Sequence, residues 1–375
     1  MAANVENIPS SAIVIERPYT SSLPAEIVAN IFQLLPAKSL VAAGLVCSRW
    51  SELAEKELTR RTAFVSRMFK DSQELRLNGT MENMEKQVYK FLNELSVVPA
   101  AVVIASFPKL SKQNREKFKK FCVKVALALP KECAIIVGLH KIHAKSLMGE
   151  NSCGLPEEVE NDGILKVSLL VIPKAKDINI TKVYVDTEVL RTKKEYWREK
   201  LRPDKKFVFL LASSRAYKCV PKIYEILDKN VVLCGGFLEM VFAVNGNSMK
   251  SYPVCALAVG GNVDVYSRVV SYDDVEDQNS WTFCSSLREM QLPIDHKLHS
   301  SVCFLMKCVY FFTEKMSLES SRDFRREFPR MKVFGFSSSG EICSHSTKVA
   351  LEKPGNNSKF LYIYSLVICV LRYRQ

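Results

Sequence analysis

The sequence predicts an α+β protein in which a small helical unit precedes a larger region of mixed α/β structure. Apolar residues between positions 23 and 58 recur every three or four residues, which is typical of short amphipathic helices. From position 84 onward, helical patterns alternate with short β-branched runs, which indicates mixed α/β layers. The 375 residues are 47% hydrophobic, which is enough to build substantial cores.

Composition shifts divide the chain into five segments. Residues 1–20 contain Pro9 and Pro18 and are expected to be a disordered tail, and residues 21–62 are expected to form the helical unit. Residues 63–83 are expected to form a polar linker with a turn at Asn78-Gly79. Two related α/β subdomains are then expected at residues 84–200 and 201–375.

Three short helices are predicted within the helical unit. Pro24 suits the first turn of a helix, and Pro36 ends that helix. Ser39 is a suitable N-cap for a second helix, and a third helix runs from Trp50 to Leu58. Helices this short cannot bury their apolar sides against one another alone, so part of that surface requires a partner.

The mixed region is predicted to alternate elements. The expected helices are 84–95, 113–129, 220–227, 279–290 and 318–328. The expected strands are 100–106, 133–139, 165–172, 207–212, 231–233, 254–259, 263–270, 301–312, 332–336 and 360–371. The last of these is the most apolar run in the chain, and it is far shorter than the ~20 residues of a membrane-spanning helix.

Charge and cysteine content restrict the location and the partners. The first residues lack the basic and apolar stretches of a secretory signal, so we expect a reducing compartment, the cytoplasm or the nucleus, with no membrane association. The twelve cysteines then serve mainly as small core residues. The net charge of +13 is spread over helical faces without an accompanying stacking motif, so we do not expect nucleic-acid binding.

The helical unit resembles the F-box family. Leu23-Pro24, Ile27, Ile31, Leu35-Pro36, Leu40, Leu45-Val46 and Trp50 follow the order and spacing of the F-box motif. The resemblance implies that these ten residues contact a Skp adaptor, which connects to a cullin scaffold and its RING subunit.

The remainder of the chain resembles FIST domains, which have been proposed to sense small ligands in bacteria. Its late strand-turn segment runs from Phe328-Pro329 through Gly335 to Gly340-Glu341-Ile342. Gly235-Gly236 and Gly260-Gly261 match glycine-marked strand ends of that family. The resemblance implies an N-terminal three-helix F-box followed by a two-part FIST region.

Residues capable of catalysis or metal binding do not form a recognised motif. His140-x-x-His143 and the set His296, His299, Cys303 and Cys308 lack zinc-site spacing, so we expect neither a metal nor a cofactor. Gly335, Ser337, Gly340 and Glu341 could cradle an anion, hold a serine nucleophile or contact a target. A turn at the end of a strand is the more common explanation, with Gly335 and Gly340 at positive φ.

The favoured function is that of a non-catalytic subunit of an E3 ubiquitin ligase. The F-box would bind the Skp adaptor, and the FIST region would bind target proteins that the sequence does not identify. The alternative is a small-ligand-sensing FIST module with a regulatory F-box, and a FIST-derived hydrolase is a weaker alternative.

Overall fold

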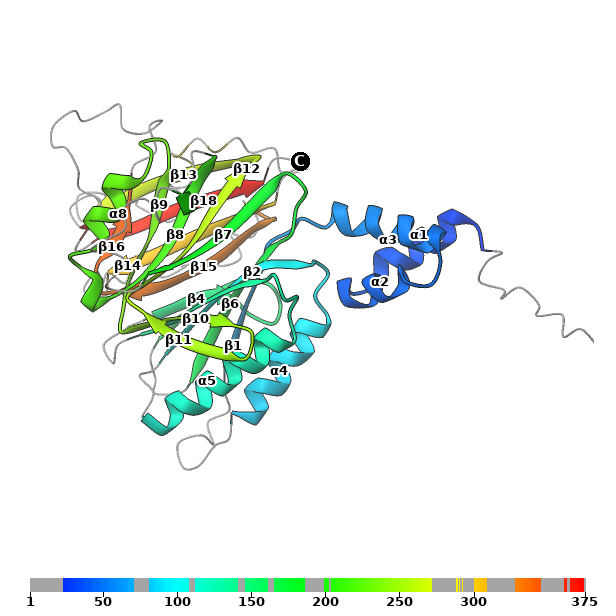
Figure 1. Ribbon diagram of the computed structural model, residues 1–375, viewed down its shortest axis with the longest axis horizontal. Helices are drawn as coiled ribbons and strands as arrows, with labels where there is room; N and C mark the ends of the chain where they lie inside the picture. The colour runs from blue at the N-terminus through cyan, green and yellow to red at the C-terminus, as the bar shows by residue number, and fades with distance from the viewer. Residues whose placement is uncertain are drawn as a thin grey trace, which may run out of the picture.

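The computed structural model confirms an α+β protein with helices at the N-terminus and mixed sheets after them (Figure 1). The structure describes residues 23–70, 81–107, 112–140, 146–160, 165–185, 199–201, 204–271, 288, 290, 292, 300–308, 328–344, 361–362 and 365–373. The expected tail at 1–20 lies outside these residues, as do almost all of the helices expected at 279–290 and 318–328. None of the described helices is long and apolar enough to cross a membrane.

The described helices lie in three places: the N-terminal unit, the α4–α5 pair, and α8 on the sheet of repeat 2. The N-terminal helices stand to one side of the body of the molecule, and α4 and α5 lie side by side on the body (Figure 1). Their bounds are α1 Ala25–Leu34, α2 Ala37–Ala43, α3 Ser48–Arg60, α4 Glu82–Asn93, α5 Lys112–Leu127 and α8 Val220–Ile226, with a 3₁₀ turn η3 at Ser214–Ala216.

The described strands form three repeats of six. Repeat 1 holds β1 Val65–Lys70, β2 Pro99–Phe107, β3 Ala134–Leu139, β4 Ser146–Glu150, β5 Pro156–Glu160 and β6 Lys166–Pro173. Repeat 2 holds β7 Ile178–Val185, β8 Lys205–Ser213, β9 Val232–Leu238, β10 Met240–Asn245, β11 Ser248–Tyr252 and β12 Val254–Gly261. Repeat 3 holds β13 Val263–Ser271, β14 Ser301–Cys308, β15 Met331–Ser338, β16 Glu341–Cys343, β17 Leu361–Tyr362 and β18 Ser365–Tyr373.

The fourth and fifth strands of each repeat form a hairpin that pairs with the sheet of another repeat. The three sheets have the orders β1-β6-β2-β3-β10-β11, β7-β12-β8-β9-β16-β17 and β13-β18-β14-β15-β4-β5. Every sheet therefore combines the first, sixth, second and third strands of one repeat with a hairpin from another. The second and third strands of each repeat run parallel, and the other pairs are antiparallel.

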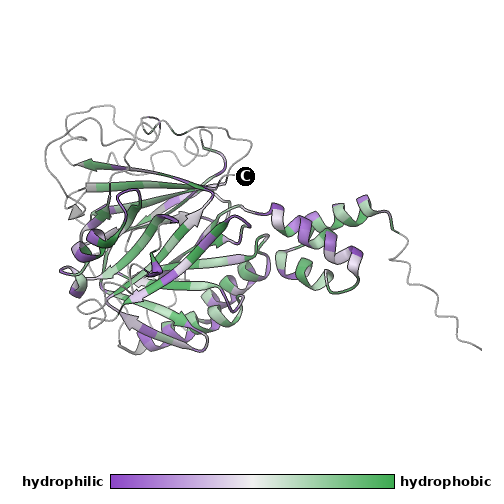
Figure 2. Ribbon diagram, turned by 45° about the horizontal axis from the view of Figure 1, so that its top comes forward, coloured by the Kyte–Doolittle hydropathy of each residue, from purple (hydrophilic) through white to green (hydrophobic). Residues whose placement is uncertain are grey.

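The main hydrophobic core lies between the three sheets. It joins residues such as Phe209, Phe304 and Phe334, whose rings are in mutual contact although each comes from a different strand. A second core fills the space between α4, α5 and the sheet of repeat 1. Figure 2 shows the strands as largely hydrophobic and the outward faces of these helices as hydrophilic, as expected for helices that cover a sheet.

The expected linker at 63–83 and the expected division at 200/201 both require correction. Residues 65–70 form β1, which pairs along its whole length with β6. The second correction concerns the two subdomains, because β10 from beyond residue 200 pairs with β3, and β15 pairs with β4. Strands from both expected subdomains share sheets, so the body consists of three interlocked repeats.

Candidate adaptor-binding surface

The N-terminal helices form a unit around a very small core. Val28, Phe32, Leu40 and Ala54 are its buried apolar residues. The Trp50 ring packs edge-on against Phe32, with 5.3 Å between ring centroids. The Arg49 guanidinium donates a hydrogen bond of 2.8 Å to the Leu23 carbonyl, which ties the start of α1 to α3.

Six large apolar side chains remain exposed on this unit. Ile27, Ile31 and Leu34 are spaced four and three residues apart along α1, so they lie on one side of that helix. Val41 on α2 and Leu45-Val46 after it are also exposed, and Leu34 and Leu45 each retain 85% of their accessible surface. We call these six residues the exposed apolar face. Among the described residues, only Leu127 and Tyr217 are further large exposed hydrophobic residues.

The ten predicted contact residues fall into three groups by exposure. Pro24, Ile27, Ile31, Leu45 and Val46 are exposed, and Leu23, Leu35, Pro36 and Trp50 are half-buried. Leu40 is fully buried, so its assignment as a contact residue is corrected to a core role. Leu34 and Val41 were not predicted as contact residues, although the helical spacing from Ile27 already places Leu34 on the same face.

The segment predicted as a ligand or target loop is mostly buried, in two strands of different sheets and the turn between them. Gly335 and Ser337 are internal to β15, Glu341 begins β16, and Gly340 is buried in the turn between the two strands. The turn is hydrogen-bonded to β9, since Phe237 N–H donates to Gly340 O and Ser339 N–H donates to Phe237 O. Among these residues only Ser339 is exposed, so the prediction of an accessible loop is wrong.

The backbone of this segment also differs from the predicted positive φ. The described glycines with positive φ are Gly154, Gly246 and Gly261, and neither Gly335 nor Gly340 is among them. A Cβ at Gly335 would overlap the backbone carbonyl oxygen of Leu305 on β14. Close packing of neighbouring strands therefore explains this glycine.

Three buried polar side chains, Ser338, Glu341 and His140, lie in or beside this segment. The Ser338 hydroxyl donates a hydrogen bond of 2.8 Å to Glu341 Oε1, and Glu341 has no solvent exposure. His140 is buried against Phe336, with 5.1 Å between ring centroids. Burial lowers the pKa of His140 to about 4, although a hydrogen bond with the Ser337 backbone opposes this shift. His140 is therefore neutral at pH 7.

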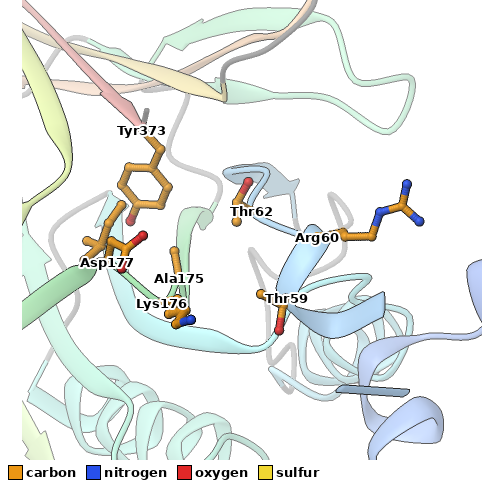
Figure 3. Close-up of a pocket in the computed structure, with 8 residues that line it drawn as sticks. Thr59, Arg60, Thr62, Ala175, Lys176, Asp177 and Tyr373 are labelled. Carbon is orange, nitrogen blue, oxygen red and sulfur yellow. The ribbon is translucent and has the colours of Figure 1, made fainter. Parts of the chain in front are cut away.

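A pocket of about 390 Å³ lies where α3 meets the body (Figure 3). Thr59 and Arg60 come from α3, Lys176 and Asp177 come from the turn before β7, and Tyr373 ends β18. The described residues contain no group of three or more metal-ligating side chains. His143, His296 and His299 lie outside the described residues, so the absence of a metal stays a prediction.

Comparison with known proteins identifies the class to which the N-terminal unit belongs. A family model described as F-box-like matches residues 20–65, so the chain carries an F-box-like domain there. This range covers α1, α2 and α3, which bear the exposed apolar face.

Most of the chain is similar to F-box only protein 22. The human protein is 23% identical over 353 residues, which cover 85% of this chain and 84% of the relative. The protein of that name from Pongo abelii is 22% identical over 351 residues, with the same coverage. A solved structure titled as a cyanuic acid hydrolase from A. caulinodans covers 83% of this chain and 100% of its own, with 7% identity and a TM-score of 0.34. Likeness at that level carries no argument about this chain.

Proposed function

We propose that this chain is the non-catalytic, substrate-binding subunit of a Skp–cullin–F-box ubiquitin ligase. The observation that carries the proposal is the exposed apolar face on an F-box-like domain. Six large apolar side chains on a unit with four buried core residues would be costly in water, and a partner surface removes that cost. An F-box domain implies a Skp adaptor as that partner.

The mechanism of such a subunit is positional. The helical unit binds the adaptor, the three-repeat body binds a target protein, and the cullin and RING subunits bring the charged ubiquitin-conjugating enzyme nearby. Holding a target lysine close to that enzyme raises its effective concentration. Both relatives are named as F-box proteins and neither name refers to an enzymatic activity, which supports a subunit without chemistry of its own.

The ligand-sensing alternative receives less support. Its loop was expected at Gly335–Glu341, and these residues, apart from the exposed Ser339, are buried in β15, β16 and the turn between them. The resemblance to FIST domains remains a prediction about the body.

Adaptor capture with charged substitutions tests the proposal. Ile31→Glu combined with Leu45→Glu places two carboxylates on the exposed apolar face without touching the buried core. Burying an unpaired charge in an apolar interface is very unfavourable, so capture of the Skp adaptor should fall at least ~100-fold. Leu127→Glu changes an equally apolar exposed residue on α5 and should leave capture unchanged. Wild-type capture by the double variant, with circular dichroism unchanged, would refute the adaptor assignment.

A further inference from the structure

Arg61 uses every N–H of its guanidinium, four within the F-box-like domain and one that reaches the body. A guanidinium has five N–H donors in a planar fork. In Arg61, Nε donates to Glu57 Oε1 at 2.8 Å, Nη1 donates to Leu35 O at 2.6 Å and to Ser96 O at 3.1 Å, and Nη2 donates to Phe32 O at 2.7 Å and to Gln33 O at 3.2 Å.

The five acceptors come from three parts of the molecule. Glu57 lies on α3, and Phe32, Gln33 and Leu35 are at the C-terminal end of α1. Carbonyl groups at a helix C-terminus lack partners within the helix and carry partial negative charge, so a cation there is favourable. Ser96 belongs to the body, in the connection between α4 and β2. One side chain therefore holds the end of α1 against both α3 and the body.

Two further contacts near Arg61 hold the helical unit against the body. Ala37 N–H, at the start of α2, donates to Leu95 O at 2.7 Å, next to the Ser96 carbonyl that Arg61 contacts. On the other side of Arg61, the chain reaches Phe64 after three residues, and Phe64 is fully buried against Tyr373 with 4.5 Å between ring centroids. The connection between α3 and β1 is thus short and attached at both ends.

We propose that Arg61 is a positioning residue that holds the adaptor-binding unit in one orientation relative to the body. This inference rests on the proposed function for its purpose, since a ligase subunit must present a bound target in a fixed direction. Lysine cannot replace Arg61, because its three N–H donors lie on one nitrogen atom and cannot serve five acceptors spread over three segments. The adjacent Arg60 offers a matched control, because it is exposed and its side chain extends away from the other side chains lining the junction pocket (Figure 3).

Distance measurements between two native cysteines test the positioning role. Among the described cysteines, Cys47 in the helical unit and Cys153 in the body are exposed, so both accept spin labels in the full chain. Two substitutions limit labelling to these two sites. Cys219→Ser removes a half-buried cysteine, and Cys284→Ser removes a cysteine outside the described residues. Pulsed electron paramagnetic resonance then measures the distribution of distances between the two labels in the wild type, Arg61→Ala, Arg61→Lys and Arg60→Ala.

The expected result is a narrow distance distribution for the wild type and for Arg60→Ala, and a distribution at least twice as wide for Arg61→Ala. Arg61→Lys should also be broader than wild type. Equal widths in all four proteins would overturn the proposal. If circular dichroism shows that Arg61→Ala does not fold, the width measured for Arg61→Lys tests the proposal instead, because this variant keeps the positive charge at the end of α1. Capture of the Skp adaptor by the unlabelled wild type is measured separately. Absence of capture would count against the proposed function, whereas the widths of the distance distributions test the role of Arg61.

Discussion

At the scale of single residues, Gly335 shows how tightly two parallel strands pack. It is paired with Leu305 on β14 and with Met148 on β4, and it has no room for a Cβ. Its importance therefore comes from contact between strands that are distant in the sequence.

Replacing Gly335 with valine should lower the free energy of unfolding by ~3 kcal/mol or more, because overpacking a close-packed interior forces backbone shifts. Gly44→Ala is a suitable control, since its added Cβ meets Ala54 at an ordinary 3.4 Å and its φ of −65° suits any residue. Thermal unfolding followed by circular dichroism measures both variants. Equal melting temperatures for Gly335→Val and the wild type would contradict the packing explanation.

His140 should make stability depend on pH. Its pKa is about 4 in the folded chain because burial disfavours the charged form, and an unfolded histidine titrates near 6.5. Between these values the unfolded chain binds a proton that the folded chain does not, so stability is full above pH 6.5 and is lost as the pH falls toward 4.

The non-titrating variant His140→Gln isolates this contribution. Denaturant unfolding at pH 7 and pH 4 should show that the wild type loses ~3 kcal/mol more than the variant over this range. The comparison cancels the carboxylates, which titrate in both proteins. An identical pH dependence of the two proteins would show that His140 is not buried in the neutral form.

At the scale of elements, β1 belongs to the body although it follows the helical unit directly. The Ser66 hydroxyl donates to Val333 O at 2.6 Å, and Phe64 N–H donates to the Ser300 hydroxyl at 2.8 Å, so this segment is tied to repeat 3. Phe64, Met68 and Phe69 are buried.

Truncated fragments test whether residues 63–80 are a dispensable linker or, through β1, part of the folded body. A fragment of residues 63–375 should fold, whereas residues 80–375 should not fold stably. Losing three buried side chains at ~2–5 kcal/mol each exceeds much of the 5–15 kcal/mol that stabilises a typical protein. Soluble yield and thermal unfolding of the two fragments measure the difference. Matching melting temperatures would restore the linker assignment.

At the scale of the whole molecule, the exchanged hairpins make the three repeats depend on one another. The β10–β11 hairpin completes the sheet of repeat 1, β16–β17 completes that of repeat 2, and β4–β5 completes that of repeat 3. Removing any repeat leaves a sheet with an unpaired strand edge, and the apolar faces of all three sheets meet in one core.

Splitting the chain at 200/201 should therefore yield two halves that do not fold separately. Residues 63–200 would lack β10, which pairs with β3 from Ile135 to Leu139, and the other half would lack β4, which pairs with β15. Co-expression should restore a folded complex that purifies as one species. Two independently folded, monodisperse halves, each with native-like circular dichroism, would show that the exchange is not structurally important.

The sequence by itself determined the features that depend on neighbouring residues. The three N-terminal helices, the exposed positions of Ile27, Ile31 and Leu45, and most strands of the body follow from local apolar periodicity and proline placement. These signals arise within a few residues, so they can be read without knowing the fold.

Only the tertiary structure decided which of these elements pair and which side chains connect them. An apolar strand pattern indicates that a strand is buried but does not identify its partner, so the hairpin exchange and the burial of Gly335, Ser337, Gly340 and Glu341 could not be inferred. Leu40 fits the same helical pattern as its exposed neighbours, and only the packing of α2 against the other helices placed it in the core. Arg61 looked like one basic residue among many, because its five acceptors, which include Leu35 O and Ser96 O, come together only once α1, α3 and the body have folded.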